Sequence, residues 1–366
     1  MTKAAELAKM GEVLTNSQIG GRRNMVINGA MQVAQRGTSF TSVSTSAYHL
    51  DRFRTGMGDT TARFTVTQAT AELNGFANSF KYDCTTAEAS LANGNARLFF
   101  HTRLEGQDLQ QIKKGTSDAE KVTVSFYVKS NKTGTYTLEL NDLDNTRSNS
   151  QTYTISSSNT WERKIITFDA DTTGAFDDDN ALSLIIYWHL IAGTNYTSGT
   201  FNTSWATSTN ANRVSSSQVN IGDSTDNTWE ITGIQLEVGS QATPFEHRSF
   251  GEELALCQRY FSKYTGSGSY MAFPFCGFAG TSSLGEMVGP LPATMRVSPT
   301  ASVNGGSNFR ILMQASDQNT TAVSIDFTSL NACRLSITAS GMTAGQAIGL
   351  INKANTFAEI TFDSEL

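Results

Sequence analysis

The chain has 366 residues, a formal net charge of -6 and charged residues at 16% of its composition. Its length suits two or three domains, and its charged fraction is below the roughly 25% of average globular proteins. Because no basic cluster accompanies the negative charge, the composition argues against a nucleic-acid-binding role. No apolar run approaches the length of a membrane span and the first residues lack a secretion signal, so we expect a chain that is made and kept soluble in a cytoplasm.

Residues 1–21 are predicted to form a short helix for attachment and trimerisation. Leu7, Met10 and Leu14 follow one another at alternating intervals of three and four, the spacing of a coiled-coil seam. A helix of this length is not stable alone in water. We therefore expect it to pack against copies of itself or against a larger assembly.

Residues 22–248 are predicted to form a jelly-roll-like β-sandwich, because short strands follow one another without regular alternation with helices. The first pair, Asn24–Ile27 and Ala30–Gln35, flanks Asn28-Gly29, a strong hairpin signal that a bulge or a bend would also accommodate. One short helix is expected within Leu104–Thr116, which has apolar residues at helical spacing.

The remaining strands of this domain follow from alternation of apolar and polar residues. Leu182–Leu190 has large side chains on both faces, so only this strand is expected to be covered on both sides. Trp161, Trp188 and Trp229 lie in hydrophobic strands and are expected in the core. The other predicted strands are Arg63–Thr67, Ser79–Cys84, Arg97–Thr102, Val122–Val128 and Tyr136–Leu140.

The stretch from Trp229 to Arg248 reads as the closing strand of the sandwich. Trp229 and Ile231 share one strand face. Ile234, Leu236 and Val238 share a face only if the alternation shifts by one residue at Gly233, which predicts a glycine bulge. Pro244 is the first proline of the chain and ends the strand. Because all five prolines lie from this point onward, the two halves of the chain are expected to be built differently.

Residues 249–366 are predicted to form a linker helix from Gly251 and a smaller β domain, so the whole chain is expected to be all-β. The four cysteines stand far apart, and neither a zinc site nor a disulfide framework is indicated. Cys84 and Cys257 are expected to be buried thiols. The predicted strands are Tyr270–Phe278, Ser283–Val288, Ala301–Val303, Phe309–Met313, Ala322–Phe327, Arg334–Thr338 and Ala358–Phe362.

Six phrases occur in the following order along the chain: NMVINGAMQVAQRGTSF, YHLDRF, LEGQDLQQIKKGTSDAEKVTVSFYVKSN, SNTWERKIITFDADTTGAF, TWEITGIQLEVGSQATPFEHR and ELALCQRYF. As a set they resemble the β-sandwich module of bacteriophage tail-fibre proteins, which is similar in outline to the galactose-binding-like jelly roll of carbohydrate-binding modules. The resemblance covers roughly residues 22–262 and implies a trimeric virion fibre that touches the host surface.

The candidate ligand-binding residues are Tyr187, His189, Tyr196 and Trp205. Sugar recognition needs aromatic faces beside amide and carboxylate groups, and these residues cluster in and before the polar segment 191–213. The segment is long and without obvious secondary structure, which is typical of functional loops. Packing, including packing against a neighbouring subunit, is the other interpretation of Trp205.

The acidic run is a candidate calcium site, since Asp169, Asp171, Asp177 and Asp179 could bring several carboxylate oxygens together. A solvated acidic loop is the alternative, because the spacing matches no EF-hand loop. No other cofactor is expected.

No arrangement of catalytic residues is recognisable. The four histidines have no context that marks a triad, and no GxSxG motif is present. Two acid pairs, Glu105 with Asp108 and Asp142 with Asp144, could be proposed for glycoside hydrolysis, but acids at turns are the simpler interpretation. The chain also lacks the repeating period of the β-helix that phage depolymerases usually show.

The sequence therefore predicts a homotrimeric phage tail fibre or similar virion protein, assembled in the bacterial host cytoplasm, that binds host-surface polysaccharide without catalysis. Its N-terminus would attach to tail or other virion proteins. One alternative is a purely structural fibre or head decoration protein. A second alternative is a glycan-degrading tailspike.

Overall fold

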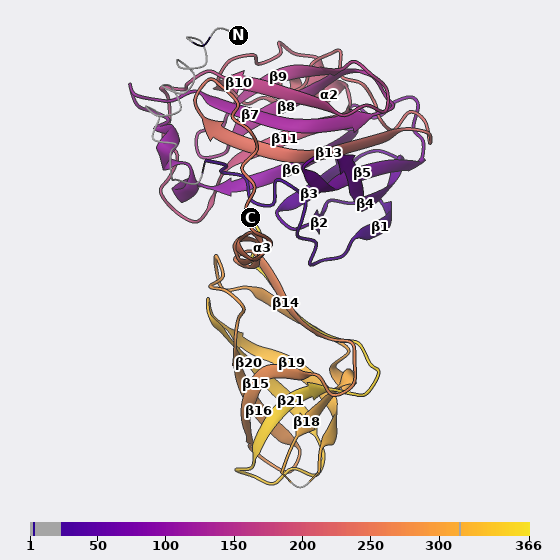
Figure 1. Ribbon diagram of the computed structural model, residues 1–366, viewed down its shortest axis with the longest axis vertical. Helices are drawn as coiled ribbons and strands as arrows, with labels where there is room; N and C mark the ends of the chain where they lie inside the picture. Colours follow the sequence, from indigo (N-terminus) through magenta and orange to yellow (C-terminus); the bar gives the residue numbers. More distant parts are fainter. Residues whose placement is uncertain (1–2, 4–22, 315) are drawn as a thin grey trace. The chain divides into compact units, whose positions relative to one another are not determined.

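The computed structural model describes residues 3, 23–314 and 316–366, and the chain divides into two compact units between Glu253 and Leu254, with Leu366 counted in the first. The division falls inside the helix α3 (Phe250–Gln258), which confirms the helix predicted from Gly251. The predicted helix of residues 1–21, with Leu7, Met10 and Leu14, lies outside the described residues. Both units are built from antiparallel strands, so the chain is all-β as expected (Figure 1).

The first unit is a sandwich of two antiparallel sheets around one hydrophobic core. The six-stranded sheet has the order β1 (Ser39–Val43), β4 (Arg63–Leu73), β5 (Phe76–Thr86), β13 (Thr228–Val238), β7 (Val122–Ser130) and β10 (Glu162–Phe168). The seven-stranded sheet has the order β12 (Ala206–Thr207), β9 (Arg147–Ile155), β8 (Gly134–Asp142), β11 (Leu182–Ala192), β6 (Arg97–Glu105), β3 (Phe53–Gly58) and β2 (Ala47–Leu50). Because β13 pairs with both β5 and β7, the last strand of the sandwich lies in the middle of its sheet.

Aromatic side chains from both sheets fill the core. Trp188 of β11 lies with its ring centroid 5.5 Å from Phe100 and 5.6 Å from Phe126, and Trp229 of β13 lies 5.8 Å from Phe100. Both tryptophans are fully buried, which confirms their predicted core positions. Trp161 is only half-buried, so its predicted core position is wrong: it flanks the edge strand β10, and its indole N–H donates to the Ala71 carbonyl.

The predicted glycine bulge is present in β13. Gly233 has φ 63°, and the register between β13 and β7 shifts between Thr232 and Gln235. A Cβ at Gly233 would lie 2.8 Å from the Phe76 ring, so both the left-handed backbone and the close contact favour glycine there. The shift turns Ile234 and Leu236 to the same core that Trp229 and Ile231 enter.

The predicted hairpin around Asn28-Gly29 is wrong. Residues 24–35 contain a turn but no strand. The Asn28 side chain donates to the Val33 carbonyl and accepts from the Val33 amide, and the Gly29 carbonyl accepts from the Ile234 amide. These side-chain and long-range bonds satisfy the backbone groups that a hairpin ladder would have paired.

The short helix predicted within Leu104–Thr116 forms only as two 3-10 turns, η1 (Gly106–Asp108) and η2 (Gln110–Ile112). Leu104 belongs to β6, while Leu109 and Ile112 are buried in the core. Lys113 has φ 52° and Gly115 has φ 82°, so the chain turns away before a longer helix can form.

Several strands besides β11 are covered on both faces, so the expectation that only this strand would be is wrong. Nearly every residue of β8 and β13 is buried as well. Segment 193–219 covers the outer face of the seven-stranded sheet, where the Ser215 and Val219 amides donate to Thr137 and Thr135 of β8. It contains the short elements α2 (Thr194–Thr197) and η3 (Asn210–Asn212).

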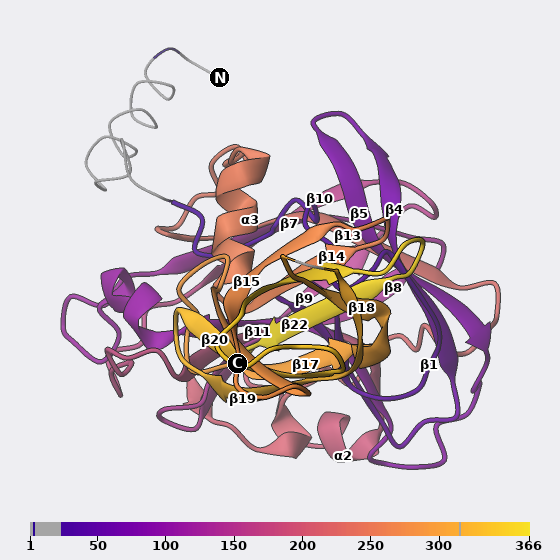
Figure 2. The ribbon, with the colours of Figure 1, turned by 90° about the horizontal axis from the view of Figure 1, so that it is seen from below.

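The second unit combines a three-stranded sheet with a closed six-stranded barrel (Figures 1 and 2). All seven strands predicted for this part of the chain are present. The sheet has the order β14 (Phe261–Gly266), β22 (Ala358–Asp363) and β17 (Thr300–Asn304). The barrel has the order β15 (Ala272–Ala279), β16 (Leu284–Pro290), β20 (Ala332–Ala339), β19 (Gln318–Thr328), β18 (Phe309–Leu312) and β21 (Ala347–Asn352), with η4 (Gly306–Asn308) before β18.

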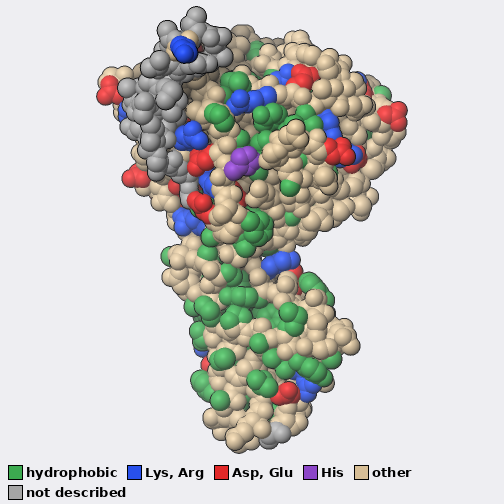
Figure 3. Space-filling model, in the orientation of Figure 1, with side chains coloured by type: hydrophobic (Ala, Val, Ile, Leu, Met, Phe, Trp, Pro, Cys, Tyr) green, Lys and Arg blue, Asp and Glu red, His purple; other side chains and the backbone are tan. Residues whose placement is uncertain are grey.

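The second unit has its own hydrophobic core and exposes many apolar side chains. Figure 3 shows green hydrophobic side chains gathered on its surface, and Phe278, Val288, Leu312 and Phe327 are each more than half exposed. Cys276 is exposed on β15, whereas Cys84 and Cys257 are buried as predicted. In the described part of the chain, no helix has both the length and the hydropathy to cross a membrane.

Candidate functional site

The outer face of the seven-stranded sheet carries a row of aromatic and cationic side chains. Alternation along β6 sends Leu98 and Phe100 into the core and leaves Phe99 and His101 on the outer face. The register places His101 opposite Tyr187 of β11. A face of this kind, buried but rich in polar groups, is the part of the sandwich in which a ligand could be recognised.

Rings stack against one another along this face. The Tyr187 ring is stacked on His101, with centroids 5.1 Å apart, and meets Phe99 edge to face at 4.9 Å. Phe99 extends over Gly56 of β3, where any Cβ would come within 1.8 Å of its ring. Gly56 therefore leaves the space that the Phe99 ring needs.

A pocket of about 240 Å³ opens beside this aromatic surface. Such a volume is below the roughly 300–1,000 Å³ of sites for drug-sized ligands, so it suits one ring of a larger molecule. The pocket is lined by Arg97, Phe99, His189, Ile191, Ala192, Tyr196 and Arg213.

His189 and Arg213, which line the pocket, are both bound to the buried carboxylate of Glu139, which does not line it. The Glu139 carboxylate accepts from His189 Nε2 at 2.8 Å and from Arg213 Nε at 2.8 Å. Burial by itself raises the pKa of Glu139, but the Arg213 charge and the His189 hydrogen bond outweigh it and bring the pKa to about 2. Glu139 is therefore an ionised acceptor at neutral pH.

The state of Glu139 determines the tautomer of His189. Burial lowers the pKa of His189 below its ordinary value even though Glu139 opposes the shift, so the ring is neutral at neutral pH. Because an ionised carboxylate only accepts, His189 Nε2 carries the proton and Nδ1 is left as an acceptor. The pocket thus combines an acceptor nitrogen with guanidinium donors, the groups that pair with sugar hydroxyls.

His101 is the least satisfied polar group on the face. It is fully buried, and neither ring nitrogen has a hydrogen-bond partner among the described residues. Burial and the neighbouring Arg103 and Arg54 lower the pKa of His101 well below its ordinary value, so the ring is neutral. The structure shows the His101 ring packed against the Tyr187 ring.

Three of the four predicted ligand-binding residues meet here. Tyr187, His189 and Tyr196 lie on or beside the pocket, but His189 and Tyr196 are buried rather than displayed on an open loop. The Tyr196 hydroxyl accepts from Arg97 Nη1 at 2.8 Å. His189 and Tyr196 are buried because segment 193–219, which was expected to be an irregular loop, folds onto the sheet and covers β8 and β11.

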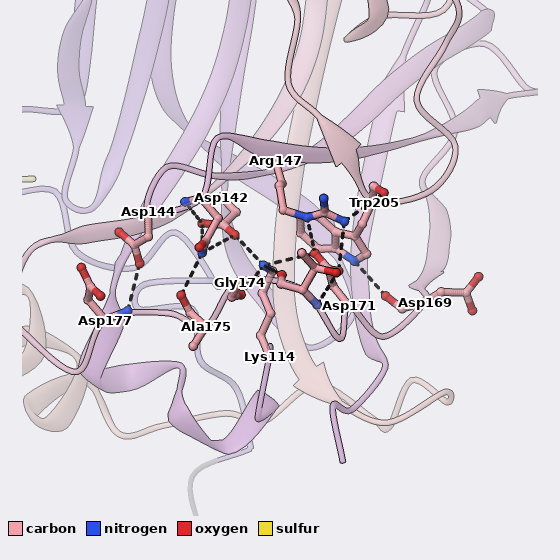
Figure 4. A network of polar contacts seen from close by, with 12 residues as sticks. Lys114, Asp142, Asp144, Arg147, Asp169, Asp171, Gly174, Ala175, Asp177 and Trp205 are labelled. Atoms are coloured by element: carbon pink, nitrogen blue, oxygen red, sulfur yellow. Dashed lines mark hydrogen bonds and ion pairs between the residues drawn. The ribbon is translucent and has the colours of Figure 1, made fainter. Parts of the chain in front are cut away.

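The fourth predicted residue, Trp205, belongs to a different cluster (Figure 4). Its indole N–H donates to the Asp169 carbonyl at 2.8 Å, and Lys114 Nζ lies 5.3 Å from its ring centroid. Trp205 also packs against the sandwich core and does not line the pocket described above. The packing interpretation is therefore the one that the structure favours.

Lys114 takes the central position of this second cluster. Its buried ammonium group lies 2.6 Å from Asp142 Oδ2 and 3.1 Å from Asp171 Oδ2, and it donates to the carbonyls of Thr173 and Gly174 (Figure 4). Arg147 Nε adds a contact of 2.7 Å to Asp171. Although burial raises the pKa of Asp171, the hydrogen bonds from Arg147 and Lys114 bring it below its ordinary value.

The predicted calcium site is not assembled from the four aspartates. Asp171 pairs with Lys114 and Arg147, Asp169 pairs with Lys121 at 2.7 Å, and Asp179 accepts from the Ala181 amide. Within the described residues, no group of three or more acidic, histidine or cysteine side chains is arranged to hold a metal ion. The Lys114 ammonium supplies the positive charge that a bound cation would otherwise bring.

Three of the four acids considered for glycoside hydrolysis, Glu105, Asp142 and Asp144, are held in structural contacts. Asp142 is fully buried against Lys114, and Asp144 accepts from the Asp177 amide. Glu105 is fully buried and accepts from the side chain of Gln107. None of these three carboxylates lines the pocket on the outer face.

Arg97, Phe99, Glu139 and Arg213 were missed as site residues. A signal for two of them was present: in the predicted strand Arg97–Thr102, Arg97 and Phe99 occupy the positions that alternate with Leu98 and Phe100. No local pattern marks Glu139 or Arg213, because 73 residues separate them from each other along the chain and only the folded cover brings them together.

No family model matches the chain, and no curated protein matches it. Several solved structures do. The enzymatically active domain of tailspike protein 4 of bacteriophage CBA120 matches 59% of this chain with 15% identity and a TM-score of 0.29; the match covers 21% of the tailspike chain.

Two carbohydrate-binding modules are also similar. TmCBM61, solved in complex with β-1,4-galactotriose, matches 59% of this chain and 99% of its own with 10% identity and a TM-score of 0.31. The family 11 module from Clostridium thermocellum, in complex with a β-1,3-1,4-mixed-linked tetrasaccharide, matches 57% of this chain and 99% of its own with 11% identity and a TM-score of 0.28. Identities this low do not establish a shared activity.

Proposed function

We propose that this chain is a bacteriophage tail-fibre or related virion fibre protein whose sandwich binds host-surface glycan without cleaving it. The observation that carries the proposal is the pocket of about 240 Å³ on the outer face of the seven-stranded sheet. It joins the Phe99 ring to hydroxyl, imidazole and guanidinium groups from Tyr196, His189 and Arg213. A sugar has an apolar ring face, which can pack on the Phe99 ring, and hydroxyl groups, which can hydrogen-bond to the polar groups of the pocket.

The chemistry of the pocket favours binding over hydrolysis. A glycoside hydrolase of the usual kind needs one carboxylic acid that carries a proton near neutral pH and a second carboxylate across the sugar. Glu139, the acid that contacts the pocket residues, has a pKa of about 2 and is held by Arg213 and His189. Glu139 is therefore ionised at neutral pH and has no proton to donate to a leaving group, and both of its oxygens already accept hydrogen bonds from Arg213 or His189.

The proposal includes a homotrimer that is attached to the virion through the N-terminal segment. Support comes from the seam of Leu7, Met10 and Leu14 and from the order of the six tail-fibre-like phrases along the sequence. Light scattering should give about three times the mass of one chain. A monomer at micromolar concentration would contradict the trimer without bearing on glycan binding.

Glycan binding is tested with the purified full chain on immobilised host-surface polysaccharide. Phe99→Leu should weaken binding about tenfold, equivalent to about 1.4 kcal/mol, because it removes the aromatic face while keeping an apolar residue. Trp205→Phe is the matched control, since Trp205 lies in the separate Lys114 cluster. Equal loss in both variants would contradict this assignment of the site.

The same mixtures distinguish the alternatives. Release of new reducing ends from the polysaccharide would favour the glycan-degrading tailspike. Absence of binding to any host glycan, together with incorporation into the particle, would favour a purely structural fibre or head decoration protein.

A further inference from the structure

We infer that the pocket on the outer face accepts an acidic sugar unit, with the carboxylate of a uronic or related sugar acid held by Arg97 and Arg213. The inference rests on the proposed function and specifies the class of glycan. It depends on the charges that line the pocket, because the lining includes two guanidinium groups and no carboxylate.

The charge of Arg97 is only weakly compensated. Its ion pair with Asp59 has an N–O distance of 3.5 Å, and both side chains are more than a third exposed. Exposed pairs of this kind contribute little, because water and salt screen both charges. The other contact of Arg97, with the Tyr196 hydroxyl, is neutral. A ligand carboxylate at this position would form a stronger, charge-assisted contact.

Arg213 retains donors after its contact with Glu139. Its Nε–H is shared between both Glu139 oxygens, at 2.8 and 3.1 Å, and its guanidinium also donates to the Tyr187 hydroxyl, with the ring centroid 4.9 Å away. A guanidinium group carries five N–H donors in a planar fork that matches a carboxylate. Glu139 therefore positions Arg213 at the pocket without using all of its donors.

The rest of the lining suits the remainder of a sugar ring. Phe99 offers an aromatic face, His189 Nδ1 is an acceptor for a hydroxyl, and Ile191 and Ala192 add apolar surface. A pocket of about 240 Å³ has room for one such ring. The whole chain has a net charge of -6, so it does not attract anions in general; the preference has to come from this local pair of arginines.

The test compares two ligands that differ at one carbon. Galactose and galacturonic acid share their ring stereochemistry, and only the second carries a carboxylate. Binding of each to the full chain is measured by ligand-observed NMR at low and high NaCl. We expect at least tenfold tighter binding of galacturonic acid at low salt, with a preference that declines as salt rises because ion pairs are screened. Equal affinities for the two sugars would overturn the inference.

Variants locate the preference. Arg97→Gln should reduce the ratio of the two affinities to near one, whereas Arg97→Lys, which keeps the charge, should retain part of it. Arg334→Gln in the second unit is the matched control, since it removes an arginine from the barrel surface, where Arg334 pairs with Asp326. If Arg97→Gln fails to fold, the salt dependence of the unaltered chain still decides the outcome.

Failure of this inference is distinguishable from failure of the proposed function. Binding of neutral host glycans without preference for the acid would refute the inference alone. Absence of binding to every sugar and to the host polysaccharide would refute the proposed function. Binding of galactose 6-phosphate more than tenfold tighter than galacturonic acid would assign the arginines to a phosphate and overturn the carboxylate.

Discussion

Replacing Lys114 by methionine should destabilise the sandwich more than any other single loss of a lysine charge in its described part. The substitution keeps the length and apolar stem of the side chain and removes the ammonium group. The side chains of Lys114, Asp142 and Asp171 are 2%, 0% and 5% exposed, so the charges left behind cannot be rehydrated easily. The carbonyls of Thr173 and Gly174 also lose their donor.

The magnitude follows from what remains around the two carboxylates. Removing one partner of a buried ion pair costs about 3–5 kcal/mol. Asp171 retains Arg147 at 2.7 Å, and Asp142 retains the amide donors of Asn145, so the low end of about 3 kcal/mol is expected. For a domain of this size, that loss corresponds to a decrease in Tm of roughly 6–12 °C.

The assay is urea unfolding followed by tryptophan fluorescence. All four tryptophans, at positions 161, 188, 205 and 229, lie in the first unit, so the signal reports on the sandwich alone. Lys121→Met is the matched control, because the Lys121–Asp169 pair is 51% and 73% exposed and should change stability by less than about 1 kcal/mol. A cost below about 1 kcal/mol for Lys114→Met would refute the reasoning.

A second variant tests whether the ammonium substitutes for a metal ion. Lys114→Ala leaves space beside the Asp142 and Asp171 carboxylates and the Thr173 and Gly174 carbonyls, all of them oxygen ligands that suit calcium. Calcium should raise the Tm of this variant and leave that of the unaltered chain unchanged. An equal response of both proteins to calcium or chelator would place a calcium site elsewhere.

Three further predictions concern stability. Trp188→Ala should cost about 3–5 kcal/mol of unfolding free energy, measured in urea, because the indole is fully buried between both sheets; a variant that unfolds at the same urea concentration would remove Trp188 from the core. Gly233→Ala should destabilise by more than about 1 kcal/mol in the same assay, since alanine is strained at φ 63° and its Cβ would meet Phe76, whereas Gly251→Ala, with open space around it, should be tolerated. Burial and Arg36 lower the pKa of His49 to about 4, so as the pH falls the unfolded chain binds a proton at this residue before the folded chain does. The contribution of His49 to stability is complete above pH 6.5 and should fall by up to about 3 kcal/mol as the pH drops towards 4. In urea titrations at several pH values, His49→Gln should reduce this dependence of stability on pH.

Local patterns determined a large part of this fold. The alternation of apolar and polar residues predicted most strands of the second unit, and Gly233, which lies between two groups of apolar residues, predicted the bulge of β13. Both are properties of neighbouring residues, since side chains alternate across a strand and glycine adopts φ 63° with the least strain. The strands β1, β2, β3, β9, β12, β14 and β21 were missed, and most of them are polar or short.

Local patterns misled where distant residues complete the hydrogen bonding. Asn28-Gly29 has the composition of a hairpin, but its backbone groups pair with Ile234 and with the side chain of Glu253. Trp161 begins an apolar strand, yet that strand lies at the edge of its sheet, so the indole is only half covered. Position within a sheet depends on strand order, which no stretch of neighbouring residues encodes.

The candidate site divides in the same way. The sequence by itself indicated that Tyr187, His189 and Tyr196 belong together, because they precede or lie in one long polar segment. Only the tertiary structure added Glu139, Arg213 and the pocket, and only it placed Trp205 and Asp171 in the separate cluster around Lys114. The physical reason is that a buried charge needs a partner, and the partner can come from any part of the chain that the fold brings within hydrogen-bonding distance.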